Sequence, residues 1–197
     1  TSCSDVFGVN RGLLNFSHPA SASSGWDGDG SISDPYRLHF DGSNDRITGP
    51  ATAARTYSVW FNPDTATNQA YIFHRDAAWN DKTSAYVMNG SLYTHYQSSG
   101  TYSIGVGTGS WYHLVISCDG TTVRFYLNGV QFASEAETAE GAQPNLFIGS
   151  STAINSFFDG SISELRTYSA ALTENQISTL YAESRPRYAN DPGVITA

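Results

Sequence analysis

Apolar and polar residues alternate with a period of two along much of this chain. The clearest case lies within residues 111–133, where Val123 and Phe125 alternate with polar neighbours. This period is typical of a strand with one buried face and one face in water. Asp119-Gly120 and Asn128-Gly129 bound the alternating run, and these residue types tolerate the positive φ of tight hairpin turns. The segment therefore predicts consecutive antiparallel strands joined by two hairpins.

The same alternation and the same turn residues predict strands along most of the chain. Asn89-Gly90 supplies a third hairpin turn. The stretch Ser17–Pro35 is rich in Ser, Gly, Asp and Pro and is expected to be a long surface loop. Strands are expected at Arg37–Phe40, Asp45–Ile47, Thr56–Asn62, Tyr71–Arg75, Ala85–Asn89, Ser91–Gln97, Trp111–Cys118, Thr122–Leu127, Val130–Ala133, Asn145–Gly149 and Gly160–Tyr168.

One helix is expected near the C-terminus. Thr173 and Gln176 have the spacing of a capping box, in which each side chain satisfies the other residue's backbone N–H. Ile177, Leu180 and Tyr181 then share one apolar face of a helix of about two turns.

A chain of 197 residues suits one all-β domain with a single core. We expect this core to span about residues 13–181, and residues 182–197 to form an extended tail, because Pro186 and Pro192 stop further helix. The tail has few apolar residues. We therefore expect it to be mobile beyond Ser184 in the isolated chain and to order only in an assembly.

The order of motifs along the chain carries a family resemblance. These motifs are Phe40–Asp45, Tyr57–Pro63, Tyr71–Asp76, the segment 111–133, Leu146–Gly149 and Phe158–Arg166. In this order they resemble the laminin-G-like members of the concanavalin-A-like jelly-roll superfamily. The resemblance implies an all-β fold, a two-sheet antiparallel jelly-roll sandwich with one short C-terminal helix. It leaves function open, because this superfamily holds lectins, carbohydrate-binding modules, adhesion domains, glycanases and virion parts.

The composition of the chain limits the classes of partner that it can bind. The net charge is −8 and the pI is about 4.9, which argues against nucleic acid, because nucleic-acid binding depends on neutralising phosphates with Lys and Arg. No run approaches the roughly 20 apolar residues that a bilayer-spanning helix needs, so membrane insertion is not expected. Cys118 shares strand parity with Leu114 and Ile116, which favours a buried free thiol, and a bridge to Cys3 stays an alternative.

A run of glutamates, Glu135 to Glu140, is the sharpest catalytic candidate. It resembles the Glu-x-Asp-x-x-Glu signature of β-glucanases in the same superfamily, which are retaining enzymes that use two nearby carboxylates. Here the middle residue is Glu137 rather than Asp, and the run directly follows the strand expected at Val130–Ala133. We therefore interpret it as a solvated loop and expect no enzyme activity.

Calcium is a second candidate, because many relatives carry this ion. The resemblance implies a structural calcium with Asp27, Asp29 and Asp41 as expected donors, and carboxylates spaced two apart suit such a site. Ser163 stands where relatives often supply an aspartate. The alternative is that these aspartates form turns, and no cofactor is expected to be required.

Aromatic and polar residues gather in the middle of the chain and suggest sugar recognition. Sugar rings stack on aromatic faces, while their hydroxyls bond to amide, carboxylate and guanidinium groups. The candidate ligand-binding residues are Arg75, Trp79, Asn80, Asp81, Tyr93, His95 and Tyr96. The alternative is that the tyrosines fill a sandwich core.

The sequence thus favours a non-catalytic surface module for glycan recognition or adhesion. The alternative is a structural role as a decoration, cement or tail component of a phage virion, and a glycan-degrading hydrolase comes third. The expected partners are a glycan or other subunits of a surface assembly, with a homo-oligomer left open. The expected location is extracellular or on a virion surface.

Overall fold

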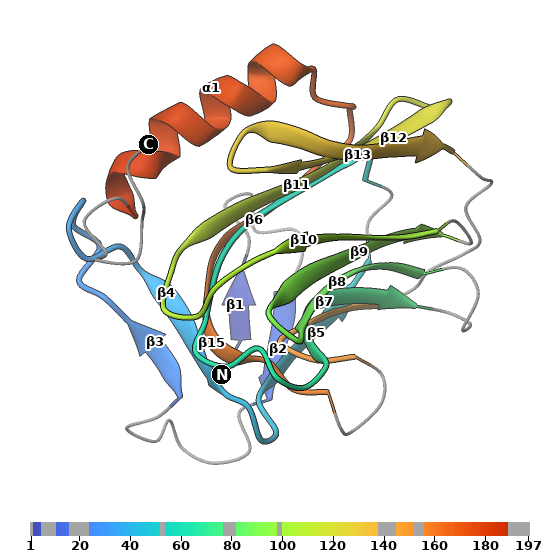
Figure 1. Cartoon of the computed structure of the whole chain (residues 1–197). Coiled ribbons are helices and arrows are strands. Elements are labelled where there is room, and N and C mark those ends of the chain that lie inside the picture. The colour runs from blue at the N-terminus through green and yellow to red at the C-terminus, as the bar shows by residue number, and fades with distance from the viewer. Residues whose placement is uncertain are drawn as a thin grey trace.

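The computed structural model describes residues 2–4, 11–15, 24–51, 54–76, 82–97, 100–137, 145–151 and 156–188. Its strands form two antiparallel sheets that pack face to face, with one helix laid across the outside of one sheet (Figure 1). The antiparallel two-sheet sandwich with a short C-terminal helix, predicted from the sequence, is confirmed.

Within the described residues, sheet A has eight strands. In spatial order they are β1 (Ser2–Ser4), β2 (Arg11–Asn15), β5 (Arg46–Pro50), β14 (Asn145–Ile148), β7 (Ala70–Asp76), β8 (Lys82–Met88), β9 (Ser91–Gln97) and β10 (Thr101–Gly105).

Sheet B has seven strands in the part of the chain that the structure describes. In spatial order they are β13 (Val130–Ala136), β12 (Thr122–Leu127), β11 (Tyr112–Cys118), β6 (Thr56–Pro63), β15 (Asp159–Tyr168), β4 (Arg37–Asp41) and β3 (Gly25–Asp27).

The core lies between the two sheets and is built from the inward half of each alternating strand. Tyr57 of sheet B stacks on Phe73 of sheet A, with ring centroids 5.6 Å apart. Tyr102 of β10 packs on Phe125 of β12 with the rings tilted and their centroids 5.3 Å apart. Burial of these rings holds the sheets together, since large aromatic side chains dominate core energetics. Cys118 is a buried free thiol, so the alternative bridge to Cys3 is not formed.

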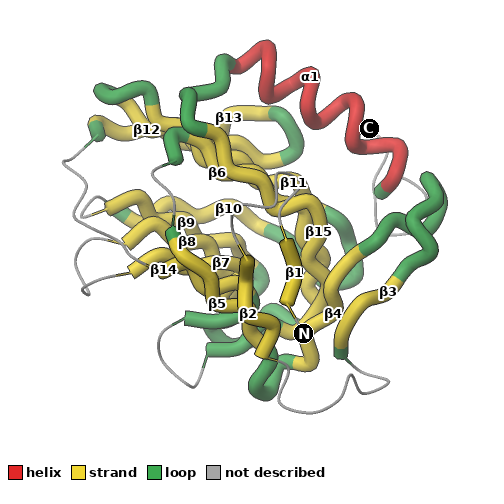
Figure 2. The backbone as a smooth tube through the Cα atoms, turned by 180° about the vertical axis from the view of Figure 1, so that it is seen from behind, coloured by secondary structure: helices red, strands yellow, loops and turns green. Residues whose placement is uncertain are grey.

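Helix α1 (Glu174–Ser184) lies across the outer face of sheet B, as the view from behind also shows (Figure 2). The predicted capping box is confirmed, because Thr173 and Gln176 bond each other's backbone N–H groups. Ile177 is fully buried and packs with Val115 and Tyr126 of the sheet below. The helix continues beyond the expected two turns to Ser184.

The expectation of an extended tail from residue 182 is wrong as far as residue 188, because residues 182–184 belong to α1. Residues 189–197 lie outside the described residues. Residues 185–187 form a 3-10 turn, η1 (Arg185–Arg187), and Tyr188 is buried. The Tyr188 hydroxyl donates to Ser163 Oγ at 2.9 Å, and Arg187 pairs with Glu164. The burial of one ring, one hydrogen bond and one ion pair therefore hold these residues on the domain, although the tail has few apolar residues.

Several short strands lie outside the sequence prediction. β3 falls within the stretch expected to be loop, and β1, β2 and β10 were not expected. β13 continues to Ala136, so the first part of the glutamate run is strand rather than loop. Glu140 lies outside the described residues.

Candidate functional site

Three tyrosines form a row across the outer face of sheet A. The strand register sets Tyr71 of β7 opposite Tyr86 of β8, and Tyr86 opposite Tyr93 of β9. The rings of Tyr86 and Tyr93 are stacked, with centroids 5.1 Å apart and planes 5° apart. Tyr71 and Tyr86 are buried while Tyr93 is half-buried, so the row ends in one accessible ring.

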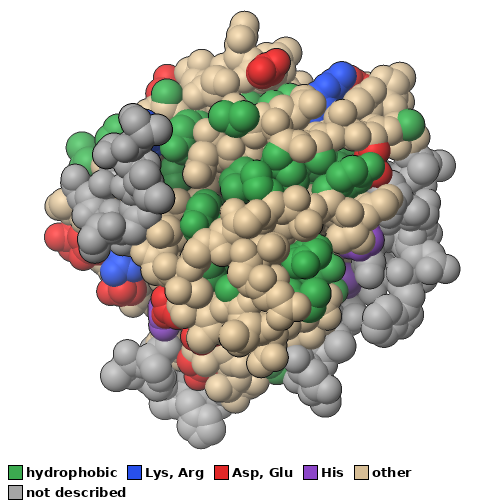
Figure 3. All heavy atoms as spheres, viewed as in Figure 1, with side chains coloured by type: hydrophobic (Ala, Val, Ile, Leu, Met, Phe, Trp, Pro, Cys, Tyr) green, Lys and Arg blue, Asp and Glu red, His purple; other side chains and the backbone are tan. Residues whose placement is uncertain are grey.

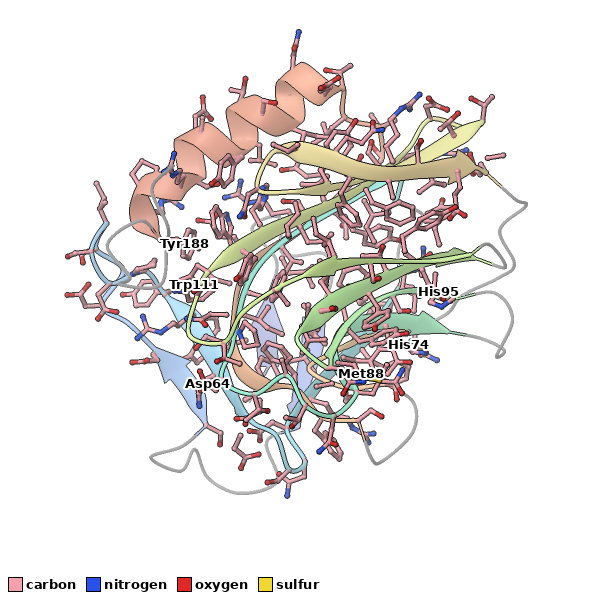
Figure 4. The ribbon with its side chains drawn as sticks, in the orientation of Figure 1. Asp64, His74, Met88, His95, Trp111 and Tyr188 are labelled. Atoms are coloured by element: carbon pink, nitrogen blue, oxygen red, sulfur yellow. The ribbon has the colours of Figure 1, made fainter. Side chains whose placement is uncertain are left out.

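A second row of polar side chains runs beside the tyrosines. The register sets His74 opposite Ser84, Ser84 opposite His95, and His95 opposite Thr101. His95 Nε2 lies 2.6 Å from the Thr101 hydroxyl, which ties β9 to the edge strand β10. His74 on β7 and His95 on β9, with β8 between them, lie near one another (Figure 4).

The accessible end of both rows is a small patch that we call the β9–β10 surface. It consists of Tyr93 and His95 on β9 and of Ser103 and Thr101 directly opposite them on β10. Both β10 hydroxyl residues are exposed, and both β9 residues are half-buried. Figure 3 shows hydrophobic side chains gathered over β8 and β9, with histidine at their margin. The patch combines an aromatic face with hydroxyl groups, which together can stack on and hydrogen-bond a polar ring. The imidazole of His95 is bonded to the Thr101 hydroxyl and holds that side chain in place.

Ser84 lies behind this surface and is fully buried. Its hydroxyl has no hydrogen-bond partner among the residues that the structure describes. An unpaired buried hydroxyl costs roughly 1–3 kcal/mol, so it is uncommon in a well-packed sheet.

Two of the candidate ligand-binding residues face the core instead. Arg75 is 3% exposed and donates to the Tyr57 hydroxyl, with its guanidinium 5.4 Å from the Tyr57 ring centroid. Tyr96 is 1% exposed and packs in the core between the sheets. We therefore do not include Arg75 or Tyr96 in the surface site.

The remaining candidates divide between the surface and the undescribed part of the chain. Tyr93 and His95 lie together on the β9–β10 surface. Trp79, Asn80 and Asp81 lie outside the described residues.

Ser103 and Thr101 were missed by the sequence analysis because β10 was not expected. The signal was present, since Tyr102 and Ile104 alternate with three small residues over Thr101–Gly105.

The aspartates expected to bind calcium have other partners. Asp27 accepts from Arg37 at 2.5 Å, while Asp29 and Asp41 each accept from a backbone N–H two residues further on. The hydrogen bonds from Ser31 hold the pKa of Asp29 below its usual value. Within the described ranges no group of three or more His, Cys, Asp or Glu side chains could hold a metal ion. The three aspartates thus act in turns and ion pairs, and a calcium site stays a prediction.

Two glutamates of the candidate catalytic run, Glu135 and Glu137, interact with neighbouring side chains. Glu137 pairs with Arg55 at 2.9 Å. Glu135 lies opposite the buried Val123, which places it on the inner face of β13. Burial raises the pKa of Tyr102, and the charge of Glu135 and its hydrogen bond to Tyr102 raise it further.

A buried serine–histidine pair lies under helix α1. Ser58 Oγ is 2.8 Å from His113 Nε2, and both residues are buried. Burial lowers the pKa of His113 to about 3, with a smaller contribution from Arg166. His113 Nδ1 has no hydrogen-bond partner within the described residues, so no carboxylate there orients the ring as a catalytic base would require.

Comparison with known families places this geometry in context. A model of the concanavalin A-like lectin/glucanases superfamily matches residues 36–178. The chain belongs to this superfamily. No curated protein matches the sequence at a significant level.

Solved structures resemble this lectin/glucanase-superfamily domain over most of its length. One is domain 4 of AbnA, a GH43 extracellular arabinanase from Geobacillus stearothermophilus in complex with arabinotriose, with a TM-score of 0.65, 25% identity and 88% of each chain covered. A second is a heptameric SAP-like pentraxin from Limulus polyphemus, with a TM-score of 0.59, 22% identity, and coverage of 77% of this chain and 83% of that one.

A third is the receptor binding domain of botulinum neurotoxin D, with a TM-score of 0.63 and 14% identity. It covers 88% of this chain, which in turn spans 48% of the toxin domain. The two structures with lower identity show a shared fold. Among the described residues, no helix is both long and apolar enough to cross a bilayer.

Proposed function

We propose that this domain is a non-catalytic module that binds a glycan through the β9–β10 surface. The observation that carries the proposal is the pairing of Tyr93 and His95 with the exposed hydroxyl residues Ser103 and Thr101 across one strand pair. A sugar ring stacked on Tyr93 would place its hydroxyls beside His95 and the β10 side chains. This combination of apolar contact and convergent polar groups is what sugar recognition requires.

The rows behind the surface support the proposal by fixing the ring that makes the contact. Tyr93 stacks on Tyr86, and Tyr86 in turn lies 5.0 Å from Tyr71 between ring centroids. A side chain already held by such contacts loses little conformational freedom when a ligand binds, which favours affinity.

The arabinanase domain supports the class of ligand. It shares 25% identity across nearly the whole chain and was solved in complex with arabinotriose. We infer a neutral oligosaccharide, because the β9–β10 surface carries no Lys or Arg to pair with an anionic sugar. We further propose that the domain acts outside the cell, because the arabinanase that contains the similar domain 4 is an extracellular enzyme.

Catalysis is not part of the proposal. A retaining glycosidase needs two carboxylates about 5 Å apart on either side of an accessible bond. Glu137 is instead paired with Arg55, and Glu135 lies on the inner face of β13 beside Tyr102.

The alternative as a virion component has less support. It rested in part on a C-terminal tail that finds its partners on neighbouring subunits, and residues 185–188 of that tail are described. Arg187 and Tyr188 instead contact Glu164, Ser163 and Trp60 of their own domain.

The proposal is tested by screening the domain against a glycan array that includes arabino-, xylo- and manno-oligosaccharides, followed by calorimetry on the hits. We expect Tyr93→Ala to weaken binding about tenfold or more, and His95→Ala by a smaller factor. Val130→Ala is the matched control, because Val130 is 70% exposed at the start of β13, on the other sheet. Binding that survives Tyr93→Ala unchanged would show that the glycan site lies elsewhere.

A further inference from the structure

Exposed apolar side chains are concentrated in one hairpin. Among the described residues four large hydrophobic side chains are exposed, and three of them belong to the hairpin of β3 and β4: Trp26 at 61%, Ile32 at 66% and Tyr36 at 62%. The fourth, Val130, is the first residue of β13. Single exposed apolar residues are ordinary, but a cluster with a polar rim marks a binding surface.

Trp26 and Tyr36 lie on the same face of this hairpin. The register sets Trp26 of β3 opposite Leu38 of β4, and Tyr36 stands two residues before Leu38. In an extended chain residues two apart share a face, so Trp26 and Tyr36 occupy diagonal positions of this strand pair, and aromatic side chains at diagonal positions can reach one ligand. β3 is the edge strand of sheet B and projects away from sheet A (Figure 1).

The hairpin is held in one shape before any ligand arrives. Arg37 bridges Asp27 at 2.5 Å and Asp34 at 2.6 Å, which ties both arms together. The ring of Tyr36 lies against Gly30, so close that a Cβ there would come within 2.5 Å of Tyr36 Cε2. The exposed ring therefore has a fixed position, and little ordering entropy is lost when a ligand stacks on it.

The charge around the rings limits the ligand. Between residues 26 and 37 the hairpin carries three aspartates, Asp27, Asp29 and Asp34, and one arginine. Arg37 is already paired with two of these carboxylates, so an anionic ligand finds no unpaired cation in the hairpin. Carboxylates beside exposed aromatic rings accept hydrogen bonds from sugar hydroxyls, and the rings stack on the apolar sugar face.

We propose that Trp26 and Tyr36 form a second glycan-binding platform, specific for a neutral sugar, with Ile32 at its margin. The ligand class rests on the proposed function, but the platform is separate from the β9–β10 surface. The hairpin and strands β8 and β9 lie on opposite sides of the molecule (Figure 1). One domain can therefore bind two different glycan chains and cross-link them. The two sites lie too far around the molecule to bind neighbouring sugars of one short chain.

The experiment is an NMR titration of the ¹⁵N-labelled domain with arabinotriose, xylotriose and mannotriose. The indole N–H of Trp26, assigned with Trp26→Phe, reports on the platform, and the amides of Tyr93 and Ser103 report on the β9–β10 surface. We expect at least one trisaccharide to shift both sets with different affinities. Trp26→Ala should weaken binding about tenfold at the platform and leave the Tyr93 shifts unchanged, while Tyr93→Ala should do the reverse.

Each outcome decides between the two proposals. Shifts at Tyr93 without shifts at Trp26 overturn the platform and leave the proposed function. Shifts at Trp26 alone retain the platform and overturn the β9–β10 site, and no shift at either place overturns both. Hexalysine is titrated in parallel, because an acidic rim beside aromatic rings also suits a basic peptide. A Trp26 shift with hexalysine and with no sugar would overturn the sugar platform in favour of a protein partner.

Cross-linking gives an independent measurement. Mixed with soluble high-molecular-mass arabinan, the wild-type domain should raise light scattering, and Trp26→Ala and Tyr93→Ala should each abolish the rise. Val130→Ala, which removes an exposed apolar side chain outside both sites, should scatter like the wild type.

Discussion

Tyr188 stacks on Trp60, with ring centroids 4.2 Å apart and planes 20° apart. This contact joins the end of the described chain to a central strand of sheet B, and Trp111 also packs against Tyr188, with centroids 4.8 Å apart. Burial raises the pKa of Tyr188 well above its usual value, so its hydroxyl stays protonated and donates to Ser163. The C-terminal turn is therefore part of the folded domain.

Removing this ring should destabilise the domain strongly. We expect Tyr188→Ala to lower the free energy of unfolding by about 3 kcal/mol, because it deletes a fully buried aromatic ring. Tyr188→Phe should cost only about 1 kcal/mol, since it removes the hydrogen bond to Ser163 and keeps the stacking. Urea unfolding measures both, with the exposed Tyr36→Ala as control. A Tyr188→Ala midpoint equal to that of Tyr36→Ala would mean that the turn does not dock in solution.

Local signals made much of this fold predictable. The capping box at Thr173 and the Asn-Gly and Asp-Gly hairpins depend on a few neighbouring residues, and the structure has them as expected. Docking of Tyr188 depends on Trp60 and Trp111, which are distant in sequence. No local pattern reports such a contact, so the tail was expected to be free.

The site residues also divide into those that a local pattern predicts and those that depend on strand pairing. Strand parity separates Tyr93 and His95 from Tyr96, because Tyr96 shares its parity with the buried Leu92. That signal was in the sequence and identifies Tyr96 as a core residue. The partnership of Tyr93 with Ser103 depends on the pairing of β9 with β10, and this required recognition of a short edge strand.

His113 should make the domain less stable in mild acid. Burial lowers its pKa from 6.5 to about 3. Below pH 6.5 the imidazole is therefore protonated in the unfolded chain and stays neutral in the folded chain. Stability from this residue is complete above pH 6.5 and is lost as the pH falls toward 3. Each pH unit in that window removes about 1.4 kcal/mol, or about 2 kcal/mol between pH 6.5 and 5.

Unfolding free energies measured at several pH values test this. His113→Gln should be less stable than the wild type at pH 7, yet should lose less stability on acidification. His39→Gln is the control, because His39 is half-exposed on sheet B. Equal pH slopes for His113→Gln and the wild type would contradict the assignment.

The aspartates of the β3–β4 hairpin should act through Arg37 and not through an ion. Asp27→Asn is expected to lower the melting temperature slightly, since part-exposed ion pairs contribute about 0–1 kcal/mol. The decrease should be the same in millimolar calcium and in excess chelator. A decrease that appears only with calcium present would instead support the calcium site predicted from the sequence, because a ligand stabilises only the state that binds it.

Two buried serines should respond in opposite directions to the same substitution. Ser58 is 2% exposed and bonds His113 Nε2, whereas Ser84 is 0% exposed and has no partner within the described residues. Ser58→Ala leaves the imidazole nitrogen without its hydroxyl and should lower the free energy of unfolding by about 1–2 kcal/mol. Ser84→Ala removes a hydroxyl that makes no hydrogen bond, so stability should stay the same or rise by about 1 kcal/mol.

Both variants delete one oxygen from a serine beside a histidine, so the comparison cancels differences in size and strand propensity. Thermal unfolding of the two variants and the wild type in one buffer decides the matter. If Ser84→Ala loses as much stability as Ser58→Ala, then the Ser84 hydroxyl is hydrogen-bonded in solution. The row of His74, Ser84 and His95 would then be a satisfied part of the sheet, and the support behind the β9–β10 surface would come from the tyrosine row alone.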